Sequence, residues 1–332
     1  MASQSAQDGA TMRAAVLVQP GRFEIRQLAL PQPGPTQVRI RLEGCGVCAS
    51  NIPAFEGREW FNYPLAPGEL GHEGWGTVEA VGDKVKHVAP GTRVAALSLH
   101  AYADCDLAEA DALVALPPAL DGMAVPAEAL GCAVNIFRRA QISAGQTVAI
   151  IGVGFLGAAL TQLATRAGAR VIGISRSPWS LELAARCGAW KTTPLDDHWR
   201  LIEEVKQLTA GRFCERVIEA TGKPWPLDLA GELTGVRGRL VIAGFHQDGT
   251  RAVNVQLWNW RGIDVINAHE RSPGVARDGM ARAVECVAQG ELDLAPLLTH
   301  RFDLTDLTAA LEAVRDRPTG FTKAVVLMGE DG

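Results

Sequence analysis

The sequence has little of what marks a membrane protein or a secreted one. Its longest uninterrupted apolar run, Val148–Leu160, is shorter than the about 20 residues of a membrane span and contains glycines. The N-terminal residues Met1–Met12 have neither a basic stretch nor an apolar core, so we expect a loose tail and no signal peptide. These absences predict a cytoplasmic protein without a membrane partner.

An excess of basic charge is also missing. The formal net charge is -5, and no basic run appears, which argues against a nucleic-acid partner. Hydrophobic residues make up 47% of the chain and charged residues 21%, as in ordinary soluble globular proteins. A length of 332 residues suits two domains.

The cysteines lack the pattern of a disulfide framework. They are seven, an odd and scattered set, and without a secretion signal reduced thiols are the default. Cys45 and Cys48 form a C-x-x-C, but neither a second pair nor a thioredoxin-like context accompanies them. A cysteine with a special role is therefore a candidate ligand or nucleophile.

What the sequence does contain is a change of periodicity near residue 130. Before it, short apolar runs such as Ala14–Val18 and Val38–Leu42, separated by Gly and Pro, predict a β-rich region. After it, strands alternate with helices, which predicts an α/β fold with a doubly wound parallel sheet. The expected strands are Thr147–Ile151, Arg170–Ile174, Arg216–Glu219, Arg239–Ala243 and Ile263–Asn267, and the expected helices include Phe155–Ala167, Pro178–Cys187 and Leu304–Arg315.

A phosphate-binding turn is predicted where the first of these strands meets its helix. Gly152, Gly154 and Gly157 form a G-x-G-x-x-G that also contains Phe155 and Leu156. Such glycines permit a tight turn, close approach of a pyrophosphate and packing of the helix, whose N-terminus favours an anion. The alternative is a glycine-rich turn that binds nothing, which the strand–helix context disfavours.

The end of the second strand bears on the choice of nucleotide. A carboxylate that would hold the ribose 2′-hydroxyl of NAD is missing there, and the sequence instead has Ser175, Arg176 and Ser177. A guanidinium with two hydroxyls suits a 2′-phosphate. NADP is therefore favoured over NAD, the alternative being that Arg176 is only a solvated loop charge.

Candidate metal ligands occur before residue 135. They are Cys48, the pair His72 and Glu73, Glu128 and Cys132. Thiolate, imidazole and carboxylate are the ligand types of a catalytic zinc. Spacing alone does not show that these side chains converge, and a lone histidine among glycines is usually a turn residue.

Several motifs together resemble the medium-chain dehydrogenase/reductase family, in particular its zinc-containing alcohol and polyol dehydrogenases. They are the Cys48 segment, Gly71-His72-Glu73, Gly91-Thr92-Arg93-Val94, the Gly-rich turn and Glu219-Ala220-Thr221-Gly222. The resemblance implies a GroES-like catalytic domain and a Rossmann domain. The expected boundaries are a tail over 1–12, the catalytic domain over 13–129, the Rossmann domain over 130–272 and a return to the catalytic domain over 273–332.

The resemblance also implies which residues hold zinc. Cys48 and His72 are the first two ligands. In sorbitol-type members the third is a Glu that precedes the phosphate turn by a fixed spacing, which points to Glu128, with Cys132 as the runner-up. Glu73 is then a fourth, exchangeable ligand. No structural zinc is expected, because the stretch that carries four cysteines in many relatives has only Cys105 here.

The proton relay implied by the family is incomplete. Ser50 is present and would accept the substrate proton, but Asn51 and Pro53 replace an Asp and a His of the usual motif. A proline cannot pass a proton on, so the path beyond Ser50 is open. Thr221 and Gly244 are implied as neighbours of the cofactor.

Taken together, these features predict a zinc-dependent, NAD(P)-linked enzyme that interconverts an alcohol and its carbonyl. The alcohol would be a secondary alcohol, a polyol or a sugar alcohol. The alternatives are a zinc-free NADPH-dependent quinone or enoyl reductase and a non-catalytic NADPH-binding protein of the same fold. A homo-oligomer is expected, since Ile263–Asn267 resembles the strand edge that pairs subunits in this family.

Overall fold

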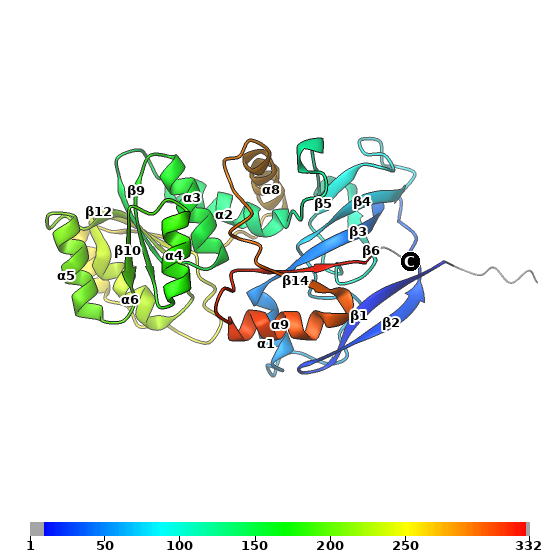
Figure 1. The fold of residues 1–332 in the computed structure, drawn as a ribbon, viewed down its shortest axis with the longest axis horizontal. Helices are drawn as coiled ribbons and strands as arrows, with labels where there is room; N and C mark the ends of the chain where they lie inside the picture. The colour runs from blue at the N-terminus through cyan, green and yellow to red at the C-terminus, as the bar shows by residue number, and fades with distance from the viewer. Residues whose placement is uncertain (1–9, 330–332) are drawn as a thin grey trace, which may run out of the picture. The chain divides into compact units, whose positions relative to one another are not determined.

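A computed structural model describes residues 10–329, and the contacts divide the chain into two compact units (Figure 1). Unit 1 contains the residues up to Glu128, the segment His300–Arg317 and the residues from Ala324 onward. Unit 2 contains Ala129–Thr299 and Pro318–Lys323.

Unit 1 is built mainly from antiparallel strands. Within the described residues β1 (Thr11–Gln19) pairs with β2 (Arg22–Ala29), and a seven-stranded sheet runs in the order β14-β15-β3-β4-β5-β7, with β6 paired to β3. The strands of this sheet are β3 (Gln37–Val47), β4 (Gly74–Val81), β5 (Arg93–Ala96), β6 (Cys105–Glu109), β7 (Leu113–Ala115), β14 (His300–Asp303) and β15 (Ala324–Leu327). The helices of the unit are α1 (Ile52–Phe55) and α9 (Leu307–Asp316).

The predicted strands of unit 1 are confirmed, and alternation explains them. Side chains point to opposite faces along a strand, so Val38, Ile40 and Leu42 of β3 are buried together. The tail expected over 1–12 lies mostly outside the described residues. Its last two residues belong to β1, which begins at Thr11.

Unit 2 is a doubly wound parallel sheet, as predicted. Its six described strands run in the order β10-β9-β8-β11-β12-β13, so the strand order reverses between β8 and β11. The strands are β8 (Thr147–Ile151), β9 (Arg170–Ser175), β10 (Lys191–Pro194), β11 (Cys214–Glu219), β12 (Thr234–Ile242) and β13 (Asp264–Asn267). The helices are α2 (Ala127–Ala140), whose first two residues belong to unit 1, α3 (Phe155–Arg166), α4 (Pro178–Arg186), α5 (His198–Leu208), α6 (Pro224–Leu233), α7 (Val255–Arg261) and α8 (Pro273–Ala288).

The core of unit 2 follows from its apolar strands. All five residues of β8 are buried, as expected for a strand covered on both faces. Ile151, Ile172, Leu201 and Leu240 meet in one cluster from β8, β9, α5 and β12. Helices cover the sheet between successive strands, as Figure 1 shows for α3 and α4 beside β9 and β10.

The return to unit 1 occurs later than predicted. It was expected at residue 273, whereas α8 and the residues up to Thr299 belong to unit 2. Asn135 Nδ2 of α2 donates to the carbonyl of Val275 at 3.0 Å, and Gln162 of α3 exchanges hydrogen bonds with the backbone of Asp293. These contacts between distant segments hold the chain in unit 2 until His300.

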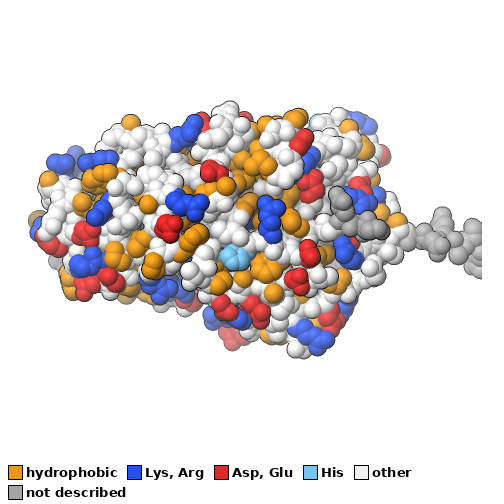
Figure 2. Space-filling model, in the orientation of Figure 1, with side chains coloured by type: hydrophobic (Ala, Val, Ile, Leu, Met, Phe, Trp, Pro, Cys, Tyr) orange, Lys and Arg blue, Asp and Glu red, His pale blue; other side chains and the backbone are white. Residues whose placement is uncertain are grey.

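The visible surface agrees with the charge balance of the sequence. On the face drawn in Figure 2, acidic and basic side chains are interspersed. Within residues 10–329, no helix is long and apolar enough to cross a membrane.

Candidate functional site

Three of the predicted metal ligands converge in unit 1. One donor atom each of Cys48, His72 and Glu73 lies within 4.8 Å of the others. The convergence follows from strand register, because Cys45 of β3 is paired with Gly74 of β4. Cys48 lies just beyond the end of β3 and His72 just before the start of β4, so the antiparallel pairing brings the two to the same end of the strand pair.

The orientation of the His72 ring is set by a backbone carbonyl. His72 Nδ1 lies 2.8 Å from the carbonyl oxygen of Leu70. Since a carbonyl only accepts, Nδ1 carries a hydrogen, and loss of a proton on metal binding would leave the lone pair on Nε2. A hydrogen bond of this kind from the second nitrogen is the usual support of a histidine that ligates a metal.

The same carbonyl also accepts a hydrogen bond from a pair of residues that sequence reasoning missed. Asn51 Nδ2 donates to Leu70 O at 3.0 Å, and the fully buried Tyr102 donates its hydroxyl to Asn51 Oδ1 at 2.9 Å. The backbone of Leu70 has a φ of 81°, a left-handed conformation that is energetically unfavourable for leucine. Asn51 was noted only as a departure from the family, and nothing in the sequence linked it to Tyr102.

The electrostatics of the cluster favour a cation. Burial alone would lower the pKa of His72, but the hydrogen bond and charge of Cys48, with the charges of Glu73 and Glu128, raise it to about 10. The pKa of the buried Tyr102 hydroxyl is also raised, first by burial and then by the negative charge of Cys45, Glu73 and Cys48.

The glycine of the C-G-V-C segment makes room for one carboxylate. A Cβ on Gly46 would lie 1.8 Å from Glu73 Oε2. Glu73 is fully buried beside a thiol and an imidazole, a donor set that fits zinc. The residues present therefore suit the metal that the motifs imply.

The remaining predicted ligands lie on α2, one turn apart. Glu128 is half-buried and belongs to unit 1 with the cluster, and its charge acts on His72. Cys132 is exposed and belongs to unit 2. Ser50 is exposed in the 3-10 turn η1 (Ala49–Asn51), and its backbone N–H donates to Cys48 Sγ at 3.5 Å.

No disulfide involves any of the seven cysteines, all of which lie within the described residues. Burial raises the pKa of the Cys105 and Cys214 thiols to about 12 each. These two side chains are packing residues and not nucleophiles.

The Gly-rich turn of unit 2 has the geometry that its sequence predicts. Gly152 follows β8 with a φ of 95°, and a Cβ there would lie 2.5 Å from Thr221 Cγ2. A Cβ on Gly157 would lie 2.1 Å from the carbonyl oxygen of Gly152. Gly154 precedes α3 without a side-chain cap, so the N–H groups of Phe155 and Leu156 in the first helical turn remain available to an anion.

The turn lies at the point where the strand order reverses. β8 and β11 are neighbours, and Thr221, two residues after the end of β11, lies against Gly152. Open parallel sheets bind their ligands at such a point, beyond the carboxyl ends of the strands. The turn therefore occupies the expected position of a dinucleotide site.

The residues proposed for nucleotide choice end β9. Ser175 is its last residue and is buried, whereas Arg176 is exposed. The Ser177 hydroxyl oxygen accepts from the N–H of Ser180 at 3.4 Å and so caps α4. No carboxylate follows the strand directly.

Comparison with known proteins places this fold and these motifs in a family. The models of an alcohol dehydrogenase GroES-like domain and of a zinc-binding dehydrogenase match residues 34–132 and 156–288. A quinone oxidoreductase of Pseudomonas aeruginosa is 30% identical over 316 residues, which cover 91% of this chain and 95% of that protein. The chain belongs to the medium-chain dehydrogenase/reductase family.

Two further relatives within this family illustrate its range. An erythritol/L-threitol dehydrogenase of Mycolicibacterium smegmatis is 27% identical, with 91% of this chain and 94% of that protein covered. A Sinorhizobium meliloti 1021 protein described as a zinc-binding dehydrogenase, solved bound to NADP, is 25% identical. Its TM-score is 0.83, with 96% of this chain and 99% of that chain covered. The chain is thus an oxidoreductase of a dehydrogenase family whose members include both a polyol dehydrogenase and a quinone oxidoreductase.

Proposed function

We propose that this protein is a zinc-dependent dehydrogenase that interconverts an alcohol and its carbonyl with a nicotinamide dinucleotide. The observation that carries the proposal is the convergence of Cys48, His72 and Glu73 at the adjoining ends of β3 and β4. With Nδ1 bonded to the carbonyl of Leu70, Nε2 is the nitrogen of His72 that would bind a metal, and with the neighbouring thiol and carboxylate it suits a divalent cation.

In this proposal Cys48, His72 and Glu128 hold one catalytic zinc, and Glu73 is an exchangeable fourth ligand. When bound, the metal supplies Lewis-acid chemistry that favours loss of the substrate's hydroxyl proton. Ser50, exposed beside Cys48, would accept that proton on its hydroxyl oxygen while it releases its own hydroxyl proton to water. Asn51 is not a relay group in this scheme, because both of its side-chain polar atoms are engaged by Leu70 and Tyr102.

The dinucleotide is proposed to bind at the Gly-rich turn, with its pyrophosphate at the N-terminus of α3. Ser175 and Arg176 at the end of β9 would contact the adenosine ribose. NADP is favoured over NAD, because a guanidinium suits a 2′-phosphate and no carboxylate is present to hold a 2′-hydroxyl. The NADP-bound relative from Sinorhizobium meliloti 1021 supports this choice.

A polyol, sugar alcohol or secondary alcohol is the proposed substrate class, supported by the similarity to the erythritol/L-threitol dehydrogenase. The second candidate is a quinone reductase, which the Pseudomonas aeruginosa relative favours. A reductase that transfers hydride to a quinone without a metal gives no reason for a thiol, an imidazole and a buried carboxylate to converge. The cluster therefore favours the first candidate.

A homo-oligomer through the β13 edge is part of the proposal. Among the described strands β13 pairs only with β12, so its other edge presents open backbone groups. The neighbouring α7 buries none of its residues, and Trp260 is 87% exposed. An edge strand beside an exposed indole suits a second copy of the same surface.

A substrate survey with a metal control tests the proposal. Polyols, sugar alcohols, secondary alcohols and a quinone would be offered with NADP(H) and with NAD(H), and the absorbance of the reduced nicotinamide followed. The proposal predicts alcohol oxidation that chelation abolishes and zinc restores. Quinone reduction that survives chelation, without alcohol oxidation, would establish the second candidate instead.

A further inference from the structure

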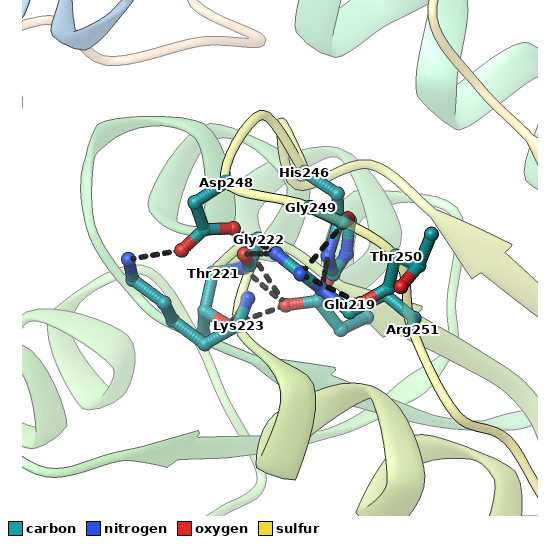
Figure 3. Close-up of polar contacts among 9 residues, drawn as sticks. All are labelled: Glu219, Thr221, Gly222, Lys223, His246, Asp248, Gly249, Thr250 and Arg251. Atoms are coloured by element: carbon teal, nitrogen blue, oxygen red, sulfur yellow. Dashed lines mark hydrogen bonds and ion pairs between the residues drawn. The ribbon is translucent and has the colours of Figure 1, made fainter. Parts of the chain in front are cut away.

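A buried carboxylate, that of Glu219 at the carboxyl end of β11, holds the surrounding segments of unit 2 together through hydrogen bonds (Figure 3). The Glu219 side chain has no exposed surface. Its Oε1 accepts from the backbone N–H of Thr221 at 2.6 Å and of Gly222 at 2.9 Å, and also from the Thr221 hydroxyl. Its Oε2 lies 2.9 Å from His246 Nε2. Donors of this kind replace the water that a buried carboxylate loses.

The hydrogen bonds of His246 define its protonation. Arg251 Nε donates to His246 Nδ1 at 2.9 Å. Because a guanidinium has no acceptor, Nδ1 is the unprotonated nitrogen, and Nε2 carries the hydrogen that is donated to Glu219. The imidazole is therefore a neutral bridge that accepts a hydrogen bond on one side and donates one on the other.

Arg251 in turn fixes the segment that contains His246. Its Nη1 donates to the carbonyls of Gly249 at 3.1 Å and Thr250 at 3.2 Å. Its Nη2 donates to the carbonyl of Gly222 at 3.3 Å and to Asp248. The hydrogen bond from Arg251 lowers the pKa of Asp248 to about 2, so this partner stays ionised. Figure 3 shows the Arg251 side chain surrounded by these groups.

The segment fixed in this way is in direct contact with the residues after β11. A Cβ on Gly244 would lie 2.1 Å from the backbone N of Gly222 and 2.7 Å from Glu219 Oε2. Thr221, held by Glu219, is in turn the residue that a Cβ on Gly152 would strike. The contacts therefore run without a gap from the segment after β12 to the phosphate-binding turn.

We propose that His246 is a positioning residue for the dinucleotide. It bridges Glu219 and Arg251 and thereby holds Gly244–Arg251 and Thr221 in place beside the Gly-rich turn. The cofactor would then bind to a surface that is already ordered. This inference rests on the proposed binding of a dinucleotide by unit 2. It requires of residue 246 one hydrogen-bond donor and one acceptor, and it requires no charge.

Two substitutions separate this requirement from simple packing. His246→Gln retains an N–H donor for Glu219 and a carbonyl acceptor for Arg251, whereas His246→Leu retains bulk but neither polar group. We expect His246→Leu to raise the Kd for NADPH or NADH about tenfold or more, because it leaves a buried carboxylate short of a donor. His246→Gln should stay within about twofold of the original protein, since both hydrogen bonds persist.

The binding measurement uses the full chain without substrate. Each dinucleotide is titrated against the protein, and its fluorescence is followed, so the result depends neither on turnover nor on bound metal. Arg261→Gln is the matched control. Arg261 also donates to backbone carbonyls, those of Glu232 and Thr234. These lie at the start of β12, whereas His246 follows its end. Its substitution should leave both Kd values unchanged, and thermal unfolding is recorded for every variant.

The outcomes are distinct. A folded His246→Leu protein with the original Kd would overturn the inference, and so would a His246→Gln protein as weak as the Leu variant or an equal loss in Arg261→Gln. If His246→Leu does not fold, Arg251→Gln replaces it, because it removes the other half of the bridge and should weaken binding by about the same factor. Failure of the unaltered protein to bind either dinucleotide would contradict the proposed function, and the inference with it.

Discussion

The metal cluster and the phosphate turn are assembled in different ways. The turn is contiguous, since one strand end and one helix start supply all of its residues between Gly152 and Gly157. The cluster joins Cys48 to the pair His72 and Glu73 only through the register of β3 with β4. A site of the first kind is visible in a sequence window, and a site of the second kind depends on a fold that brings separate segments together.

The two sites also differ in what holds them. The turn depends on missing side chains, which allow Gly152, Gly157 and Thr221 to approach one another. In the cluster, the orientation of the His72 ring depends on a hydrogen bond to the carbonyl of Leu70, which Asn51 also holds. Substitutions should therefore be able to disable one site and leave the other working.

The largest effect is expected from His72→Ala. Removing this imidazole should lower kcat/KM by more than about 100-fold, because changes to groups that merely support a metal ligand already cost 10- to 100-fold. The Kd for NADPH should not change. Steady-state kinetics and a fluorescence titration on the same preparation provide both values. A parallel loss of dinucleotide affinity would mean that the two sites are not independent.

Gly152→Ala is the converse experiment. A φ of 95° is unfavourable for alanine, and its Cβ would lie 2.5 Å from Thr221 Cγ2. We expect the Kd for NADPH to rise about tenfold or more, as backbone strain of 1–3 kcal/mol implies, with zinc content unchanged. Gly91→Ala is a suitable control, because Gly91 also has a positive φ but has no atom near its Cβ position. Equal affinities in the two variants would show that the turn does not bind the dinucleotide.

Ser175→Asp tests which nucleotide the residues at the end of β9 prefer. An acid at the end of β9 should repel a 2′-phosphate and accept from a 2′-hydroxyl. The ratio of the NADP to the NAD specificity constant should fall about tenfold, which corresponds to roughly 1.4 kcal/mol. An unchanged ratio would contradict the proposed preference for NADP.

Thiol labelling is expected to give the smallest signal, but it distinguishes Glu128 from Cys132 as the third zinc ligand. With zinc bound, Cys132 should react with a thiol reagent at about pH 8, whereas the buried Cys105 and Cys214, whose pKa values are raised to about 12, should not. Chelation should expose Cys48 as well. Cys132→Ser removes the first of these signals and serves as the control. Protection of Cys132 by zinc would replace Glu128 with Cys132 as the third ligand.

Much of unit 2 could be predicted because its signals are local. The apolar β8 and the helix opened by Ser177 and Pro178 are both found where expected. β10, with the residues Lys191–Pro194, was missed because a short, polar edge strand has no distinctive pattern.

The return of the chain to unit 1 was placed too early for a different reason. The hydrogen bonds from Asn135 to Val275 and from Gln162 to Asp293 join segments far apart in sequence, and no periodic pattern in the sequence predicts them.

The candidate sites show the same division. Cys48, His72 and Glu73 could be named from their residue types and from the family resemblance, but only the strand register shows that they meet. The support from Asn51 and Tyr102 and the bridge of Glu219, His246 and Arg251 could not be predicted. Each depends on side chains that the fold brings together, and none of these residue types is unusual by itself.

The most direct test of the central claim is the zinc content of the purified protein and of Cys48→Ser, measured together with NADPH binding. We predict about one zinc per chain in the original protein, as expected of a single catalytic site, and a large loss in the variant. The Kd for NADPH should be the same in both. Full alcohol dehydrogenase activity without bound zinc, or zinc retained at the original level in Cys48→Ser, would contradict the proposed metal site.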